Sequence, residues 1–258
     1  MVRPPARLTS VASVHAVSAA RPLRERLRRP AITLCHRYDF GDDASLVGDD
    51  LGSPEAWDAL RTRTSGPFAL PATGDALAEA AHGDAALVAR AAAISRWLER
   101  QGITSMASYG VGVPRLELLL REARPEVDLT VTEYAPENVE RLRELLPDVG
   151  VRRHDLLADP PLDAELHLMH RIDTELRNAD WRTVFARLRG QRILWVAAGL
   201  VGPRGLALQV LALRGSRGRT RAGLLRTHGA FESLWSATHR ARPVDVGDLP
   251  AWVLEPRD

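Results

Sequence analysis

The sequence has no lysine: all 35 basic residues among its 258 are arginines. This absence excludes chemistry built on a lysine Schiff base, such as ordinary pyridoxal-phosphate catalysis. It also excludes the lysine-containing phosphate loop of nucleoside triphosphatases. Cysteine is almost absent as well, because Cys35 is the only one. We therefore expect neither an internal disulfide framework nor a cysteine-rich zinc site.

Long apolar runs are also missing. No stretch approaches the roughly 18 uninterrupted apolar residues of a membrane helix, so we expect no membrane association. Residues 1–30 lack the strongly apolar block of a secretory signal, and we predict a cytoplasmic location. With 45% hydrophobic and 26% charged residues, the composition is that of a globular protein that buries a sizeable core.

Two arginine clusters, within residues 21–29 and 214–221, raise the question of nucleic acid. The net charge is only +2, and aromatic residues make up only 5% of the chain, so base stacking lacks its usual platform. We therefore expect no nucleic-acid partner, although an RNA-acting enzyme remains an alternative. The acid pairs within residues 42–50 are interpreted as solvated loop acids rather than a cation site.

The chain divides near residue 84. Residues 1–83 have few periodic runs and predict a mainly helical or loop extension, which would cover the substrate side as a lid. In residues 84–258, strand and helix patterns alternate with short connections, which indicates a parallel sheet covered on both faces. A tight turn inside residues 239–256 predicts a final antiparallel hairpin. The expected fold class is α/β, a Rossmann-like and mostly parallel seven-stranded sheet.

The individual elements follow from these patterns. Strands are predicted within residues 103–108, 127–133, 149–155, 165–170 and 191–198, followed by the two hairpin strands. Helices are predicted within residues 84–102, 114–123, 136–146, 178–189, 205–213 and 227–235. Asp84 is the expected N-cap of the first helix, and Gly102 is its expected stop.

Ligands of such sheets bind beyond the carboxyl ends of the strands. Gly110 and Gly112 follow the first predicted strand and allow close approach of a ligand to the backbone. Glu133 ends the second strand, where a carboxylate can accept both ribose hydroxyls of a nucleoside-containing cofactor. Asp155 ends the third strand, where it can accept the exocyclic amine of adenine, and Leu156 can pack on the ring.

From about residue 105 to residue 253 the sequence resembles the class I S-adenosylmethionine-dependent methyltransferases. The resemblance includes the segments SYGVG, TEYAPENVERLR and RRHDLLADPP and the closing hairpin. It implies S-adenosyl-L-methionine as cofactor, with the methionine part at the glycine turn. The cofactor-binding residues that it implies are Ser108, Tyr109, Gly110, Gly112, Glu133, Tyr134, Asp155, Leu156 and His170.

Methyl transfer from a sulfonium needs alignment of the nucleophile, and it needs a base only if the nucleophile must lose a proton. His170 is the candidate base because its ordinary pKa lies near working pH, and Asp173 is a second catalytic candidate that could hold an amine substrate. We expect a small organic methyl acceptor, and a homodimer is left open. His167 and His170 point to opposite faces of a strand, so no metal site is expected.

Two alternatives remain open at this point. Ser108 stands where the family usually has an acid and Pro114 where it has a third glycine, which keeps open a protein that binds the cofactor or a nucleoside without transferring methyl. A nicotinamide-dependent oxidoreductase also uses glycines and an acid after the second strand. Its fingerprint needs a glycine at position 115, where this sequence has Arg115.

Overall fold

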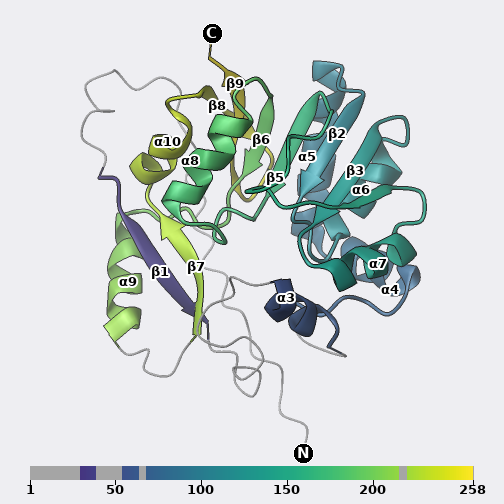
Figure 1. The fold of residues 1–258 in the computed structure, drawn as a ribbon, viewed down its shortest axis with the longest axis horizontal. Coiled ribbons are helices and arrows are strands. Elements are labelled where there is room, and N and C mark those ends of the chain that lie inside the picture. Colours follow the sequence, from purple (N-terminus) through teal and green to yellow (C-terminus); the bar gives the residue numbers. More distant parts are fainter. Residues whose placement is uncertain (1–29, 39–53, 64–67, 215–219, 258) are drawn as a thin grey trace, which may run out of the picture.

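The computed structural model describes residues 30–38, 54–63, 68–214 and 220–257. A sheet with helices on both faces forms its centre (Figure 1). The first arginine cluster, most of the second and the acid pairs of residues 42–50 lie outside the described residues.

Seven strands form the central sheet in the order β4-β3-β2-β5-β6-β9-β8. The first five strands of this order pair in parallel, and β9 runs antiparallel to both β6 and β8. The predicted α/β fold with its C-terminal antiparallel hairpin is confirmed. The strands are β2 (Ser105–Tyr109), β3 (Asp128–Glu133), β4 (Gly150–Arg153), β5 (Leu166–His170), β6 (Ile193–Val196), β8 (His239–Asp245) and β9 (Pro250–Pro256).

Helices connect these strands and precede them. The longest, α5, begins and ends as predicted: the Asp84 side chain accepts from the Leu87 N–H at 3.0 Å, and Gly102 has a left-handed φ of 65°. Within the described ranges, none of the helices has both the length and the apolar character that a bilayer crossing requires. The helices are α3 (Pro54–Arg61), α4 (Gly74–His82), α5 (Ala85–Gln101), α6 (Arg115–Ala123), α7 (Pro136–Leu145), α8 (Asn178–Arg187), α9 (Pro203–Arg214) and α10 (His228–Trp235).

The sheet has a hydrophobic core on each face. Along β6, Leu194 and Val196 point into a core shared with α4, α5, α6 and α7, while Ile193 and Trp195 point into one shared with α8 and α10. This alternation with burial on both sides is what a covered parallel sheet requires. Because α4 and α5 contribute to the same core, the predicted division between residues 83 and 84 falls between two helices that pack together.

A second, two-stranded sheet was not expected from the sequence. β1 (Thr33–Tyr38) and β7 (Thr220–Arg226) pair antiparallel, with an irregularity between His36 and Arg37. Figure 1 shows this ribbon beside α9, away from the central sheet. Of the arginine cluster in residues 214–221, Thr220 and Arg221 begin β7, and residues 215–219 lie outside the described residues. Pairing with a distant strand thus gives β7 a structure that its local sequence does not predict.

Strand order reverses between β2 and β5. From β2 the chain proceeds outward to β3 and β4, and then returns to the other side of β2 with β5. In open α/β sheets the crevice beyond the carboxyl ends of the strands at such a point is the ligand site. The fold therefore directs attention to the loops that follow β2, β3 and β5.

Candidate functional site

The loop after β2 makes two left-handed bends. Gly110 and Gly112 have φ values of 59° and 56°, a conformation that favours glycine because it has no Cβ. The N–H of Val111, between them, donates to the carbonyl of Thr132 on β3 at 3.2 Å. A Cβ on Gly110 would lie 3.1 Å from the Ile172 side chain, so the loop after β5 packs directly on this turn.

Glu133 links the end of β3 to the glycine turn. Its Oε2 accepts from the Gly112 N–H at 3.0 Å, and its Oε1 accepts from the Tyr134 N–H at 2.7 Å. The residue is 6% exposed. The structure thus brings together three of the predicted site residues, Gly112, Glu133 and Tyr134. The buried Glu133 carboxylate binds the loop after β2 as well as the residue that follows β3.

An arginine from the N-terminal region covers the same turn. A Cβ on Gly112 would lie 2.8 Å from Cζ of Arg61, at the end of α3, so the guanidinium rests on the glycine. Burial lowers the pKa of Arg61, while the charges of Glu133 and Glu175 raise it. The sequence did not single out Arg61. It lies in WDALR, an ordinary amphipathic helix whose sequence carries no motif for this contact.

The loop after β5 is strained and tightly held. Arg171 has a φ of 62°, the one positive value of a non-glycine residue in the described chain. The Asp173 carboxylate is 1% exposed and accepts from the N–H groups of Ala198 and Gly199 at 2.8 and 2.7 Å. Arg226 on β7 donates to the carbonyl of Asp173. Asp173 therefore ties this loop to the end of β6.

Glu175 lies in the same loop, close enough to Arg61 and Glu133 for their charges to act on it. The side chain of Glu175 is exposed, and desolvation by its surroundings raises its pKa, while a hydrogen bond from Thr174 Oγ1 at 2.9 Å and the charge of Arg61 oppose this rise.

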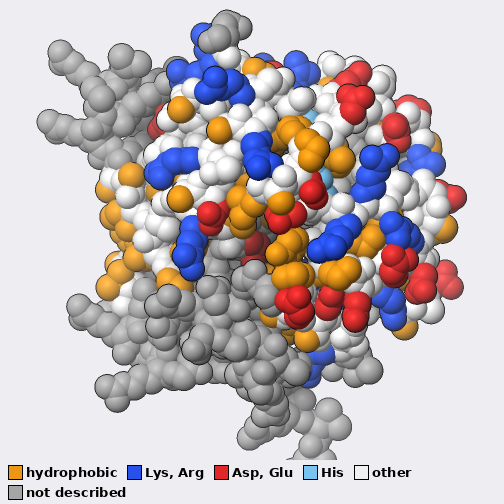
Figure 2. Space-filling model, in the orientation of Figure 1, with side chains coloured by type: hydrophobic (Ala, Val, Ile, Leu, Met, Phe, Trp, Pro, Cys, Tyr) orange, Lys and Arg blue, Asp and Glu red, His pale blue; other side chains and the backbone are white. Residues whose placement is uncertain are grey.

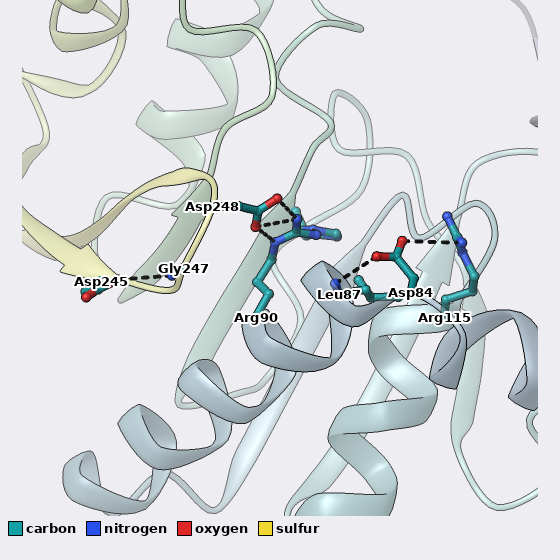
Figure 3. A network of polar contacts seen from close by, with 8 residues as sticks. Asp84, Leu87, Arg90, Arg115, Asp245, Gly247 and Asp248 are labelled. Atoms are coloured by element: carbon teal, nitrogen blue, oxygen red, sulfur yellow. Dashed lines mark hydrogen bonds and ion pairs between the residues drawn. The ribbon is translucent and has the colours of Figure 1, made fainter. Parts of the chain in front are cut away.

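His170, at the end of β5, is engaged by an arginine. Arg90 on α5 lies with Nη1 3.2 Å from His170 Nε2, and its other nitrogens bind Asp248 at 2.6–3.0 Å (Figure 3). Because a guanidinium can only donate, Nε2 must accept and the ring proton must sit on Nδ1. Burial, followed by the charges of Arg90 and other arginines, lowers the pKa of His170 well below its ordinary value.

The loop after β4 is folded on itself. Asp155 Oδ1 accepts from the Leu157 N–H at 2.8 Å, and the Asp155 N–H donates to Asp159 Oδ2 at 2.8 Å. Leu156 is partly buried and packs against the core beneath α8 and α10. The predicted adenine-side residues are thus at the edge of the sheet next to Glu133, with one oxygen of Asp155 used within the loop.

Tyr109 and Ser108 turn their side chains into the protein. The Tyr109 hydroxyl lies 2.9 Å from His167 Nδ1, and the opposite ring nitrogen lies 3.3 Å from Gln191 Oε1. Since that amide oxygen accepts, Nδ1 accepts from the tyrosine. His167 thus faces one side of the sheet and His170 the other, as expected for residues three apart on a strand. Among the described residues, no group of three or more His, Cys, Asp or Glu side chains could hold a metal ion.

Comparison with family models and with curated protein sequences gives no match for this chain. Solved structures do match. The chain is similar to human N-acetylserotonin methyltransferase solved with S-adenosylmethionine, with a TM-score of 0.53, 18% identity and coverage of 72% of this chain and 55% of that one. For PigF with S-adenosylhomocysteine the TM-score is 0.54, at 16% identity, covering 71% and 58%. For the mitomycin 7-O-methyltransferase MmcR it is 0.53, at 16% identity, covering 84% and 76%.

The chain has the class I methyltransferase fold. The strand order and the terminal hairpin agree with this assignment. The chain spans little more than half the length of the first two of these methyltransferases, at 55% and 58%.

The structure also contains a buried pair that the sequence did not predict. Ser108 Oγ donates to Glu117 Oε1, on α6, at 2.8 Å. Burial raises the pKa of Glu117 to about 7, against the lowering effect of that hydrogen bond. A carboxyl group thus reaches β2 beneath the glycine turn from the following helix. The sequence signal for this pair was a glutamate on the apolar face of a helix. Pattern analysis treats a glutamate as exposed, so the pair was not predicted.

Proposed function

We propose that this chain is an S-adenosylmethionine-dependent methyltransferase that methylates a small organic molecule. The observation that carries the proposal is the hydrogen bond between Glu133 and the Gly112 N–H. It brings a carboxylate suited to ribose hydroxyls beside a turn whose backbone a ligand can approach closely. The glycine turn follows β2 and Glu133 ends β3, so both lie at the carboxyl ends of these strands, next to the reversal of strand order.

The residues around the turn fit the cofactor. The absence of a Cβ at Gly112 lets the Arg61 guanidinium lie against the turn, and the Nε of Arg61 is buried without a hydrogen-bond partner among the described residues. Gly110 and Gly112 would hold the methionine end, Glu133 the ribose, and Asp155 with Leu156 the adenine. When bound, the cofactor supplies an activated methyl group. The similar proteins solved with S-adenosylmethionine and S-adenosylhomocysteine support this assignment.

The chain's own contribution is to orient the acceptor, exclude water and handle a proton. We keep His170 as the candidate base and Asp173 as the candidate that positions the acceptor side. His170 Nε2 must leave Arg90 before it can take a proton, because a nitrogen lone pair serves one donor. Asp173 acts through the loop that it holds, since both its oxygens bind backbone N–H groups.

The distribution of charge on the surface and the similar proteins both support a small methyl acceptor. Figure 2 shows acidic and basic side chains interspersed over the visible face of the described residues, whereas a nucleic-acid enzyme would present one continuous basic surface. The mitomycin 7-O-methyltransferase acts on a small molecule, as its name states. We also propose that residues 1–83 are an extension that acts as a substrate lid on the methyltransferase-like domain of residues 84–258, in a cytoplasmic protein whose dimerisation size-exclusion chromatography would test.

One observation favours a second candidate, a protein that binds the cofactor without transferring methyl. Both residues proposed for the acceptor side already have partners in the protein: His170 binds Arg90, and Asp173 binds the backbone of Ala198 and Gly199.

Calorimetry with S-adenosylhomocysteine, S-adenosylmethionine and NAD tests the proposal. We expect binding of both adenosyl compounds by the wild type, no binding of NAD, and at least tenfold weaker binding in Glu133→Ala. Transfer of labelled methyl to a panel of small phenols, amines and carboxylic acids then separates the two candidates. Binding of NAD alone would contradict the proposal, and tight cofactor binding without any transfer would favour the non-methylating protein.

A further inference from the structure

Arg61 is fixed in front of the glycine turn by its own helix. Asp58, one turn earlier on α3, accepts from the Asn138 N–H at 3.1 Å and the Glu137 N–H at 3.4 Å, at the start of α7. A carboxylate at a helix N-terminus is favoured by the free N–H groups and by the helix dipole. Because α7 follows the strand that ends in Glu133, this cap fixes Arg61 relative to Glu133.

The guanidinium of Arg61 is held in one plane. Its Cζ lies 5.2 Å from the ring centre of Trp57 and 5.9 Å from that of Phe68, and the two rings meet edge to face. Nη1 donates to the carbonyl of Phe68 at 2.9 Å. Aromatic faces favour a cation at these distances, and the planar group loses its rotational freedom before any ligand arrives.

The opposite edge of the guanidinium carries Nε and Nη2. Nε is buried and finds no hydrogen-bond partner among the described residues, and Nη2 is the atom nearest to the Cβ position of Gly112. A buried donor without an acceptor is destabilising, because it has lost its hydrogen bonds to water. The Nε and Nη2 hydrogens point in parallel, which is the arrangement that binds both oxygens of one carboxylate.

We propose that Arg61 binds the carboxylate at the methionine end of the cofactor through Nε and Nη2. This inference rests on the proposed function and assigns the recognition of one group within it. A cation is needed here, because the negative charges of Glu133 and Glu175 interact with this position. Without Arg61 they would repel the carboxylate of the cofactor. Arg61 thereby makes α3 part of the cofactor site, although α3 precedes the first strand of the central sheet.

A carboxylate could also be supplied by the methyl acceptor, and the two sources are separable. S-adenosylhomocysteine and its decarboxylated analogue share the adenosine, the sulfur and the amine, and they differ only in the carboxylate. Calorimetry with the wild type is the first arm. We expect binding of the analogue to be about 10- to 100-fold weaker, the range of a charge-assisted pair. Equal affinity for the two compounds would overturn the proposal without any variant.

The second arm uses Arg61→Met, which keeps an unbranched apolar side chain and removes the guanidinium with its charge, together with Arg61→Lys. The affinity of Arg61→Met for S-adenosylhomocysteine should fall by the same factor, while its affinity for the decarboxylated analogue should equal that of the wild type. The affinity of Arg61→Lys for S-adenosylhomocysteine should lie between those of the wild type and Arg61→Met. Arg182→Met, on the exposed side of α8, is the control for net charge. Circular dichroism and thermal unfolding establish that each variant is folded.

The outcomes distinguish this inference from the proposed function. If the wild type binds no adenosyl compound, both fail. If the wild type binds S-adenosylhomocysteine and Arg61→Met binds it equally well, the proposed function stands and the role of Arg61 is refuted. If Arg61→Met weakens both compounds equally, Arg61 only supports the structure, and the inference is refuted as well.

Discussion

Ser108 on β2 and Glu117 on α6 share a buried hydrogen bond of 2.8 Å directly below the glycine turn. The contact joins β2 to α6, the helix that follows it. The Ser108–Glu117 pair therefore packs beneath the bends at Gly110 and Gly112. A carboxyl group in such a place is sensitive to pH, and it gives the first prediction.

Glu117→Gln should remove part of the pH dependence of stability. The pKa of Glu117 is raised to about 7 in the folded protein from an unfolded value of 4.5, so between these values the native state binds the proton more tightly than the unfolded chain. The free energy of unfolding of the wild type therefore falls as pH rises from about 4.5 through 7, by on the order of 3 kcal/mol for this group.

Urea unfolding at pH 5 and pH 8 measures this effect. Glutamine resembles the protonated acid and still accepts from Ser108, so the variant should match the wild type at pH 5 and be more stable at pH 8. Glu175 titrates in the same window in both proteins, and the difference between them isolates Glu117. Parallel pH profiles for the two proteins would contradict the prediction.

Gly112→Ala should weaken binding of S-adenosylhomocysteine by at least tenfold. The substitution introduces a side chain at a φ of 56°, and its Cβ would overlap the Arg61 guanidinium. Gly102→Ala is the matched control, because Gly102 has a φ of 65° but nothing within 4 Å of its Cβ position.

Both glycine variants should lose about 1–2 kcal/mol of stability from the left-handed backbone alone, and only the first should lose affinity. Chemical denaturation and calorimetry measure the two quantities separately. Equal affinities of the two variants for S-adenosylhomocysteine would show that the contact between Gly112 and Arg61 is not part of the site.

Asp173→Asn should destabilise the protein by about 1–3 kcal/mol. One carboxylate oxygen becomes an NH2 group that faces a backbone N–H, at Ala198 or Gly199, and leaves it without an acceptor. Asp163→Asn, at an exposed position, should change the stability little. Denaturant unfolding of both variants at pH 7 checks this, and equal midpoints would argue against a positioning role.

Arg90→Met should raise the pKa of His170. Burial lowers that pKa first and the charge of Arg90 second, so the removal of Arg90 recovers part of the shift and frees Nε2 to bind a proton. Arg192→Met, which removes an arginine paired with Glu255, is the control. NMR titration of the imidazole measures the pKa directly. If the pKa of His170 is the same in both variants, Arg90 does not control this ring.

The central fold was predictable because each of its elements has a strong local signal. Asp84 and Gly102 mark the two ends of α5, and the apolar strands alternate with amphipathic helices. The ribbon of β1 and β7 was missed because its two halves lie far apart in the sequence, and neither has a pattern that predicts a strand alone. Non-local pairing leaves no trace in a short window of sequence.

The candidate site was predictable in outline for the same reason. Gly110, Gly112 and Glu133 stand at strand ends, and topology alone brings strand ends together. Arg61 and Glu117 could not be found this way, because their role depends on where a helix docks and which face it turns inward. Each appears in the sequence as one charged residue among many.

The β1–β7 ribbon has a consequence for synthesis. The Ile32 N–H donates to Thr227 Oγ1 across a sequence separation of 195 residues, and the ribbon ends at this contact. While the nascent polypeptide leaves the ribosome, the strand that contains Cys35 must wait for its partner until the residues that separate the two strands have been translated.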